Sequence, residues 1–306
     1  MKKYEYDYIT GADGKQIAVN ATTGECHDTI TLTVPLGTQL ITPEQQRENA
    51  ESKNRREAEH WRRATNASLG SFCLVGTTQD FPDLSPQTAA RLIFLNTYSD
   101  YTSGGLNKLF KNPKTKIPVM RSDLPDILRL SRKAADEFFN ETSPKYLIKS
   151  DDDALSVNGS IFLRGSLKRK QYNPYQKIYI DGVRKLYSMV QPSQHKHLGY
   201  LFKMLPYVNL EYNVLCHNPL ESNLDDIQLM TVSEFCGAIG YDISNWHRLN
   251  KIYKNLRFDV DGKQVRFCAF VTDGGNTSDM RIFVNPRVLY NGSDFNKVEV
   301  LGAFCR

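Results

Sequence analysis

The side chains best suited to recognising a ligand lie on one predicted helix, residues 244–255. Trp246, Leu249 and Tyr253 recur at helical spacing, so we expect them to face the core. The opposite face then carries polar and basic side chains: Ser244, Asn245, His247, Arg248, Lys251 and Lys254. Asn and Arg can form paired hydrogen bonds with adenine and guanine edges, while Ser and Lys suit phosphates. The pattern predicts a helix that reads double-stranded DNA, with an ordinary solvated basic helix as the alternative.

Two further groups of basic residues could contact a DNA backbone. Residues 160–204 hold nine basic residues and one acid, Asp181, and they include a run in a predicted linker: Lys168, Arg169 and Lys170. The second group lies on a hairpin predicted over 256–284: Lys263, Arg266 and Arg281. Each neutralised phosphate would add to a salt-dependent affinity. The linker bases could equally be solvated.

A second predicted helix, residues 131–140, has the same spacing but a different charge. Ala135 and Phe138 are expected to face inward, and the outward residues are Arg132, Lys133, Asp136, Glu137 and Asn140. DNA phosphates would repel the two carboxylates. We therefore leave two interpretations open, base reading by Arg132, Lys133 and Asn140, or pairing with a second subunit or another protein.

Patterns typical of enzymes and metal sites are incomplete. There is no Gly-x-x-x-x-Gly-Lys-Ser/Thr phosphate loop, so ATP hydrolysis is not expected. The His-Lys-His run at 195–197, followed by Tyr200, superficially resembles the His-hydrophobic-His and tyrosine of rolling-circle nicking enzymes, but its middle residue is Lys and no carboxylate stands close by. The Cys-His pairs at 26–27 and 216–217 lack partners at zinc-ligand spacing. We predict no catalytic residue, no cofactor and no metal, and keep a nicking enzyme as a remote alternative.

An internal repeat relates the two predicted helices. Residues 91–101 resemble residues 200–210 at an offset of 109, and Ile161-Phe-Leu163 resembles Ile282-Phe-Val284 at an offset of 121. The offset grows only across predicted loops. Two copies of one fold are the simplest explanation.

Each copy contains a long apolar helix, a short capped helix, a second helix after a tight turn, and a hairpin. In the first copy these elements are predicted at 86–101, 122–130, 131–140 and 146–163, and in the second at 198–207, 231–239, 244–255 and 256–284. The order is typical of a winged helix-turn-helix, whose second short helix fits a major groove roughly 12 Å wide. Winged helices also serve as protein-docking modules.

The N-terminal region differs from both copies. Short strands are predicted at 4–9, 16–20 and 29–34, and a helix with alternating charges and no apolar stripe follows from Thr42. That helix is a solvated linker or an arm that touches nucleic acid or a partner. The predicted organisation is an appendage at 1–41, a linker helix at 42–66, a first winged helix at 67–166, a basic linker at 167–185 and a second winged helix at 186–306.

Composition sets the class of the protein. The chain has 306 residues, a net charge of +5, 40% hydrophobic and 24% charged residues, which is typical of globular proteins. It has no apolar run of membrane-spanning length and no apolar stretch after its charged N-terminus. Six cysteines occur without a Cys-x-x-Cys pair, as in reduced proteins. We expect a cytoplasmic protein with no membrane association.

The second copy resembles the winged-helix replication proteins of plasmids and phages of Gram-positive bacteria, of the RepL type and their phage relatives. The resemblance spans roughly residues 195–293 and rests on 198–205, 229–236 and the Asn-Pro-x-x-x-x-x-Gly ending within 282–292. It implies binding to an origin or operator without catalysis. The additional N-terminal copy departs from that pattern and is similar to two-domain plasmid initiators of the tandem winged-helix kind.

The expected protein is α+β, with two tandem winged helix-turn-helix domains, an N-terminal β appendage and a linker helix. It is expected to bind double-stranded DNA as a homodimer and to initiate replication, with host replication or transcription proteins as further partners. The alternatives are a transcriptional regulator with the same domains and a protein-docking adaptor, for example in segregation.

Overall fold

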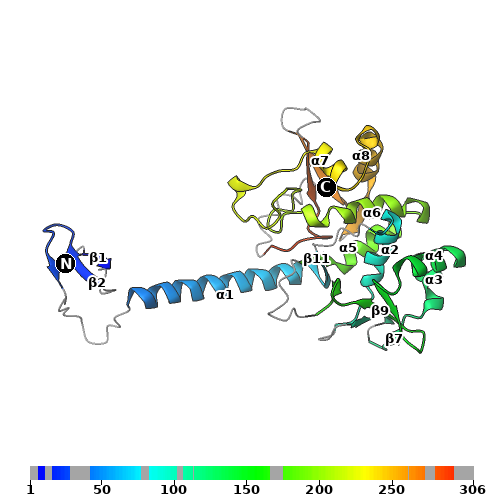
Figure 1. Cartoon of the computed structure of the whole chain (residues 1–306), viewed down its shortest axis with the longest axis horizontal. Helices are drawn as coiled ribbons and strands as arrows, with labels where there is room; N and C mark the ends of the chain where they lie inside the picture. Colours follow the sequence, from blue (N-terminus) through cyan, green and yellow to red (C-terminus); the bar gives the residue numbers. More distant parts are fainter. Residues whose placement is uncertain are drawn as a thin grey trace. The chain divides into compact units, whose positions relative to one another are not determined.

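The computed structural model describes residues 6–10, 16–27, 42–76, 83–101, 106–112, 114–165, 175–260, 262–272 and 280–292. The chain divides into two compact units, Met1–Asn54 and Arg55–Arg306. Helices and strands are mixed along it (Figure 1), which confirms the predicted α+β class.

The N-terminal unit contains a small antiparallel sheet. Its strands, in sheet order, are β1 (Tyr6–Thr10), β2 (Gln16–Asn20) and β3 (Cys26–His27). The Asn20 side chain accepts hydrogen bonds from the amides of Thr22 (2.9 Å) and Thr23 (3.2 Å), which forms the turn after β2. The first two strands lie where the sequence predicts them, and the strand predicted at 29–34 lies outside the described residues.

Helix α1 (Pro43–Leu69) begins at its predicted cap. The Thr42 hydroxyl accepts a hydrogen bond from the Gln45 amide (3.2 Å), and the Gln45 side chain accepts one from the Thr42 amide (3.1 Å). Residues 53–64 are all exposed, as the lack of an apolar stripe predicts. The helix ends at Leu69 rather than residue 66, because Leu69 is buried against Tyr179 and Tyr290.

Residues 83–165 form helices around a three-stranded sheet. The elements are α2 (Pro86–Asn96), β5 (Leu106–Lys108), β6 (Phe110–Asn112), β7 (Ile117–Pro118), η1 (Arg121–Asp123), α3 (Leu124–Leu128), α4 (Arg132–Thr142), β8 (Leu147–Lys149) and β9 (Leu155–Asn158). The sheet order is β5-β9-β8. Helix α3 ends where Arg129 adopts a φ of +56°, and Ser131 caps α4 by accepting a hydrogen bond from the Ala134 amide (3.3 Å). The tight turn between the two helices therefore lies where it was predicted.

Residues 192–292 repeat this order. The elements are η2 (Pro192–Gln194), α6 (His195–Lys203), η3 (Leu205–Tyr207), η4 (Leu224–Asp226), α7 (Val232–Ala238), η5 (Ile243–Asn245), α8 (Trp246–Asn255), β12 (Arg257–Val260), β13 (Lys263–Arg266), β14 (Cys268–Val271) and β15 (Arg281–Val284). Val214 pairs with Phe283 of β15, and β15 pairs with β14. Across this sheet the segment at Val214, which precedes α7 and α8, lies beside β15, and β15 lies beside β14. The order β5-β9-β8 is the same, because the last strand of the half is again the central one.

Two predictions about strands were wrong. Residues 256–284 form two hairpins, β12-β13 and β14-β15, rather than one. The match of 161–163 with 282–284 also fails, because β10 (Phe162–Leu163) pairs with β4 (Phe72–Gly76), whereas β15 pairs with β14. The strand equivalent to β15 is β9. Similar apolar segments fit several sheets, so their resemblance does not determine which partner each strand takes.

Part of the predicted basic linker is built into the fold. Residues 175–185 form β11 (Tyr175–Tyr179), which joins the sheet β10-β4-β11, and the start of α5 (Ile180–Met189). Gln176 is 1% exposed and donates hydrogen bonds to the carbonyls of Leu205 (3.3 Å) and Val208 (2.9 Å). The basic charge predicted a linker that follows DNA or is solvated, but Tyr175, Gln176, Ile178 and Tyr179 of β11 are buried.

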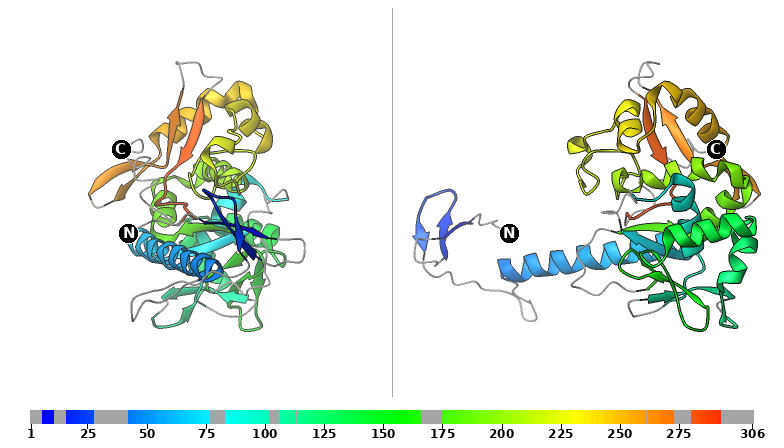
Figure 2. Two further views of the ribbon diagram at one scale, coloured as in Figure 1. Left: turned by 90° about the vertical axis from the view of Figure 1, so that its left-hand side faces the viewer. Right: turned by 45° about the vertical axis from the view of Figure 1, so that its right-hand side comes forward.

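The two repeated halves pack on each other through α2 and α6. The views of Figure 2 show one half, cyan to green, stacked against the other, yellow to orange. A Cβ atom on Gly199 would lie 1.7 Å from the carbonyl oxygen of Pro86, so the helices meet backbone to backbone. A single hydrophobic cluster extends through both halves. The two predicted domains therefore share one core.

Candidate nucleic-acid interface

Helix α8 buries one face and leaves a polar face open. Leu249 and Tyr253 are fully buried, and half-buried Trp246 lies edge-on to Phe235 with ring centroids 6.4 Å apart. Tyr253 also stacks on Phe270 of β14 at 6.4 Å, which fixes the helix on the hairpin behind it. The predicted contact residues lie on the other side: Ser244, His247, Arg248, Lys251 and Lys254 are exposed, and Asn245 is half-buried. The structure thus places these residues away from the buried face of α8.

The start of this surface is organised by Asp242, a residue that the sequence analysis missed. Its carboxylate accepts hydrogen bonds from the Ser244 amide (2.9 Å), the Ser244 hydroxyl (2.8 Å) and Asn245 Nδ2 (3.1 Å). These bonds hold the pKa of Asp242 below its ordinary value, the Ser244 contribution being the largest. Asp two residues before Ser is a cap signal readable from the sequence. Ser244 and Asn245 must exchange these bonds before they can contact a base.

His247, Lys251 and Lys254 recur every three to four residues on the exposed face of α8, and the Lys254 ammonium also lies 5.9 Å from the Phe270 ring. Arg248 and Ile252 face α6 instead, where they line a pocket together with Lys196. The face with His247, Lys251 and Lys254 is therefore the one best placed to enter a groove, and Arg248 lies at its edge.

The predicted wing residues lie on both hairpins of the second half. Lys263 is exposed at the start of β13. Arg266 on the same strand and Arg281 on β15 are half-buried, and each has one guanidinium nitrogen buried without a hydrogen bond among the described residues. Lys263 is thus the most available of the three. Lys168, Arg169 and Lys170 lie outside the described residues.

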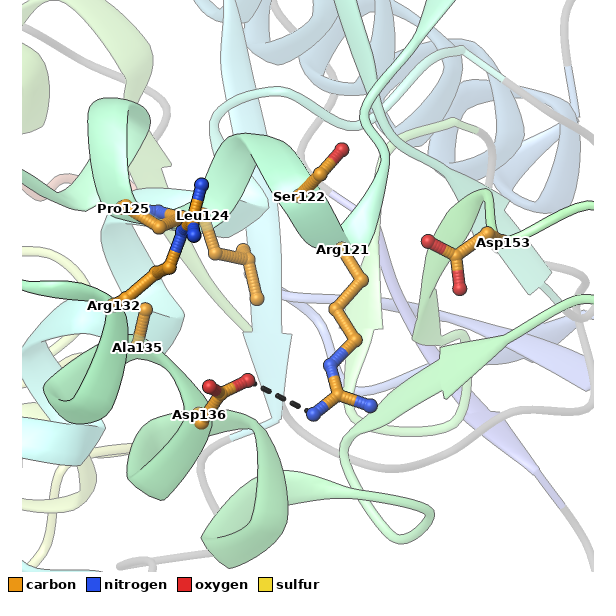
Figure 3. Close-up of a pocket in the computed structure, with 8 residues that line it drawn as sticks. All are labelled: Arg121, Ser122, Leu124, Pro125, Arg132, Ala135, Asp136 and Asp153. Atoms are coloured by element: carbon orange, nitrogen blue, oxygen red, sulfur yellow. Dashed lines mark hydrogen bonds and ion pairs between the residues drawn. The ribbon is translucent and has the colours of Figure 1, made fainter.

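The equivalent surface of the first half has a mixed charge. Arg132, Lys133 and Asn140 are exposed on α4, as predicted. Asp136 pairs with Arg121 at 2.8 Å, as Figure 3 shows, and the Arg121 guanidinium lies 4.5 Å from the Phe139 ring.

These groups border a pocket of about 330 Å³ between η1, α3, α4 and the turn before β9. Arg132 and Asp136 line it from α4, and Asp153 closes it from the turn (Figure 3). Asp153 itself pairs with Lys149 at 3.0 Å. Opposite charges alternate around this pocket, so it has no strong preference for a polyanion.

The His-Lys-His run does not form a joint site. His195 is fully buried, its ring centroid 4.3 Å from that of Tyr187, with Arg91 Nε 3.4 Å from His195 Nδ1. His197 instead lines the pocket between α6 and α8. Among the described residues no group of three or more His, Cys, Asp and Glu side chains could hold a metal ion.

Within the described ranges, each helix is either too short or too polar to cross a bilayer. Comparisons of the chain with protein-family models, with curated proteins and with solved structures find no match.

Proposed function

We propose that this protein binds double-stranded DNA sequence-specifically through two winged helix-turn-helix halves, as a cytoplasmic replication initiator or origin-binding protein of a plasmid or phage. The observation that carries the proposal is the open face of α8, where His247, Lys251 and Lys254 are exposed on a helix that aromatic contacts hold against α7 and β14. A rigid helix with a polar, basic outer face suits the major groove.

The repeated topology supports the same proposal. In each half a helix and a short strand segment precede two helices joined by a tight turn. One hairpin follows in the first half and two in the second, and in each half the last strand pairs with strands on both sides. This is the order of a winged helix-turn-helix, in which the second helix of the pair contacts DNA and the hairpin reaches the adjacent backbone. A homodimer on a two-fold site, with host replication or transcription proteins recruited to it, extends the proposal.

The first test is binding of the full chain to fragments of its own upstream region and nearby repeats, measured by fluorescence anisotropy in a salt series with unrelated DNA as competitor. A site preferred by about 10³-fold or more over competitor supports an initiator or regulator. Uniformly weak, salt-sensitive binding overturns the proposal and favours a docking adaptor.

Lys251→Ala should weaken binding to the preferred site by about 1–3 kcal/mol and relax the preference at one base pair, because Lys251 lies mid-line on the open face of α8. Lys263→Ala, on β13, should weaken binding to all sequences alike and reduce the salt slope by about 1. Anisotropy with a panel of single base-pair variants measures both effects. If Lys251→Ala lost the same affinity for every base-pair variant, Lys251 would not contact a base.

Asp136→Asn separates the two interpretations of the first half. It removes a carboxylate and releases Arg121 from their 2.8 Å pair. If α4 lies on DNA, affinity should rise by about threefold or more at low salt, since one repulsive charge is lost and one cation is freed. Asp225→Asn, an exposed carboxylate on η4, is the control. An unchanged affinity in Asp136→Asn would assign α4 to a protein contact.

A further inference from the structure

A second pocket lies between α6 and α8, beside the open face of α8. Its volume is about 210 Å³. Residues from α6, the segment before η5, and α8 line it: Lys196, His197, Tyr200, Tyr241, Arg248 and Ile252. The two helices are far apart in sequence, so only the fold brings these side chains together.

The charge of this pocket is one-sided. Lys196 and Arg248 are cationic, His197 adds an imidazole, and no carboxylate is among the lining residues. Lys196 and Arg248 are exposed, and neither forms an ion pair with another residue in the part of the chain that the structure describes. The nearest acid along the chain, Asp242, is not among the lining residues, and its carboxylate accepts hydrogen bonds from Ser244 and Asn245. None of the lining residues therefore supplies a counterion for this positive charge.

One polar atom of the pocket is buried without a hydrogen-bond partner among the described residues. His197 Nδ1 is buried and makes no hydrogen bond among the described residues. Burial lowers the pKa of His197, and the charges of Lys196 and Arg248 lower it further. An anion in the pocket would supply both the missing acceptor and the missing negative charge.

The tyrosines give this pocket a rigid wall. Tyr200 and Tyr241 lie edge-on, with ring centroids 5.0 Å apart. The Tyr241 hydroxyl donates a hydrogen bond to the Asn245 carbonyl (3.2 Å), which ties the wall to the start of the α8 surface. Ile252 adds an apolar side. The arrangement combines a preformed cavity with Arg, Lys and His donors from two helices, which matches the several acceptor oxygens of a phosphate group.

We propose that the pocket between α6 and α8 binds a phosphate group. Two sources share this chemistry, a backbone phosphodiester of the DNA that α8 contacts and a free phosphate ion or monoester. The first source rests on the proposed function and the second does not. In either case Arg248 binds the phosphate group, at the edge of the α8 surface, rather than a base.

Titration of the full chain with inorganic phosphate, against chloride at equal ionic strength, tests the pocket directly. The imidazole resonances of His197, followed by NMR, should shift and saturate. Lys196→Ala and Arg248→Ala should each raise the phosphate dissociation constant by at least about 10-fold, because each removes a charge-assisted hydrogen bond. Both side chains are exposed, so folding should be unaffected. Lys251→Ala, which removes a charge of α8 outside the pocket, should bind phosphate like the wild type.

DNA fragments with single neutral methylphosphonate linkages form the second arm. If the ligand is a backbone phosphodiester, neutralising one particular linkage should weaken DNA binding by the wild type about 10-fold or more. The same neutral linkage should not weaken DNA binding by Lys196→Ala any further. Phosphate binding without any DNA binding would support the free ligand and overturn only the proposed function. The pocket assignment is overturned if inorganic phosphate leaves His197 unshifted and no single linkage shows this dependence on Lys196.

Discussion

Gly199→Ala should lower the free energy of unfolding of the chain by roughly 3 kcal/mol or more. The new Cβ would lie 1.7 Å from the Pro86 carbonyl oxygen and 2.2 Å from its carbon, both of them backbone atoms that no rotamer change can move. Helices α2 and α6 would have to separate, and the core that the two halves share would open. Urea denaturation followed by circular dichroism measures the loss as a lower midpoint.

Gly237→Ala is the matched control for this substitution. Gly237 lies in α7, and a Cβ added there meets nothing within 4 Å. Alanine should therefore raise stability by up to about 1 kcal/mol, through its higher helix propensity. If Gly199→Ala were as stable as Gly237→Ala, the backbone contact between α2 and α6 would be refuted.

The stability of the protein should fall by about 3 kcal/mol as the pH drops from 6.5 to 4, through His195 alone. Burial, followed by the charges of Arg91 and Arg129, lowers the pKa of His195 from 6.5 to about 4. The unfolded chain then binds a proton that the folded chain does not. The stabilisation is thus complete above pH 6.5 and is lost progressively down to the folded-state pKa.

A difference between two pH profiles isolates this contribution. His195→Gln should be less stable than the wild type at pH 7, because its contacts with Tyr187 and Arg91 are altered, but its stability should decline less between pH 6.5 and 4. Carboxylates with lowered pKa values, such as Asp83, Asp100 and Glu234, lose their stabilisation as the pH falls through their ordinary values of 3.8 and 4.5, and this loss is common to both proteins. His247→Gln, at an exposed site, is the control for removing an imidazole. Equal slopes in the wild type and His195→Gln would contradict the assignment.

Protonation of His195 lowers stability because this residue lies where the two halves meet. Tyr187 stacks on Phe94 with ring centroids 3.8 Å apart, and its other side contacts the His195 ring, tilted by 32° at 4.3 Å, so three rings from α2, α5 and α6 pack together. Arg129, the residue that ends α3, donates hydrogen bonds to the carbonyls of Tyr187 (2.6 Å) and Val190 (2.5 Å). Protonating His195 would place a cation beside Arg91 and Arg129, which the cluster cannot solvate.

Local patterns in the sequence predicted the helices and their inner and outer faces. The caps at Thr42, Ser131 and Thr231 set the starts of α1, α4 and α7, because a hydroxyl that accepts an amide hydrogen bond acts within one turn of the chain. The 3.6-residue period of Trp246, Leu249 and Tyr253 likewise predicted which side of α8 is buried. Such signals need only neighbouring residues.

The tertiary structure alone decided which strands pair and which site residues meet. The pairing of β10 with β4, the backbone contact of Gly199 with Pro86, and the separation of His195 from His197 depend on segments distant in sequence. The same holds for Arg248, which the sequence placed among base contacts and the fold places beside Lys196 in the pocket. A helical period determines the direction in which a side chain points, but not which residues of other elements it meets. The tertiary structure places Lys196 and His197 of α6 beside Arg248 of α8, and these residues line the pocket that we propose binds phosphate.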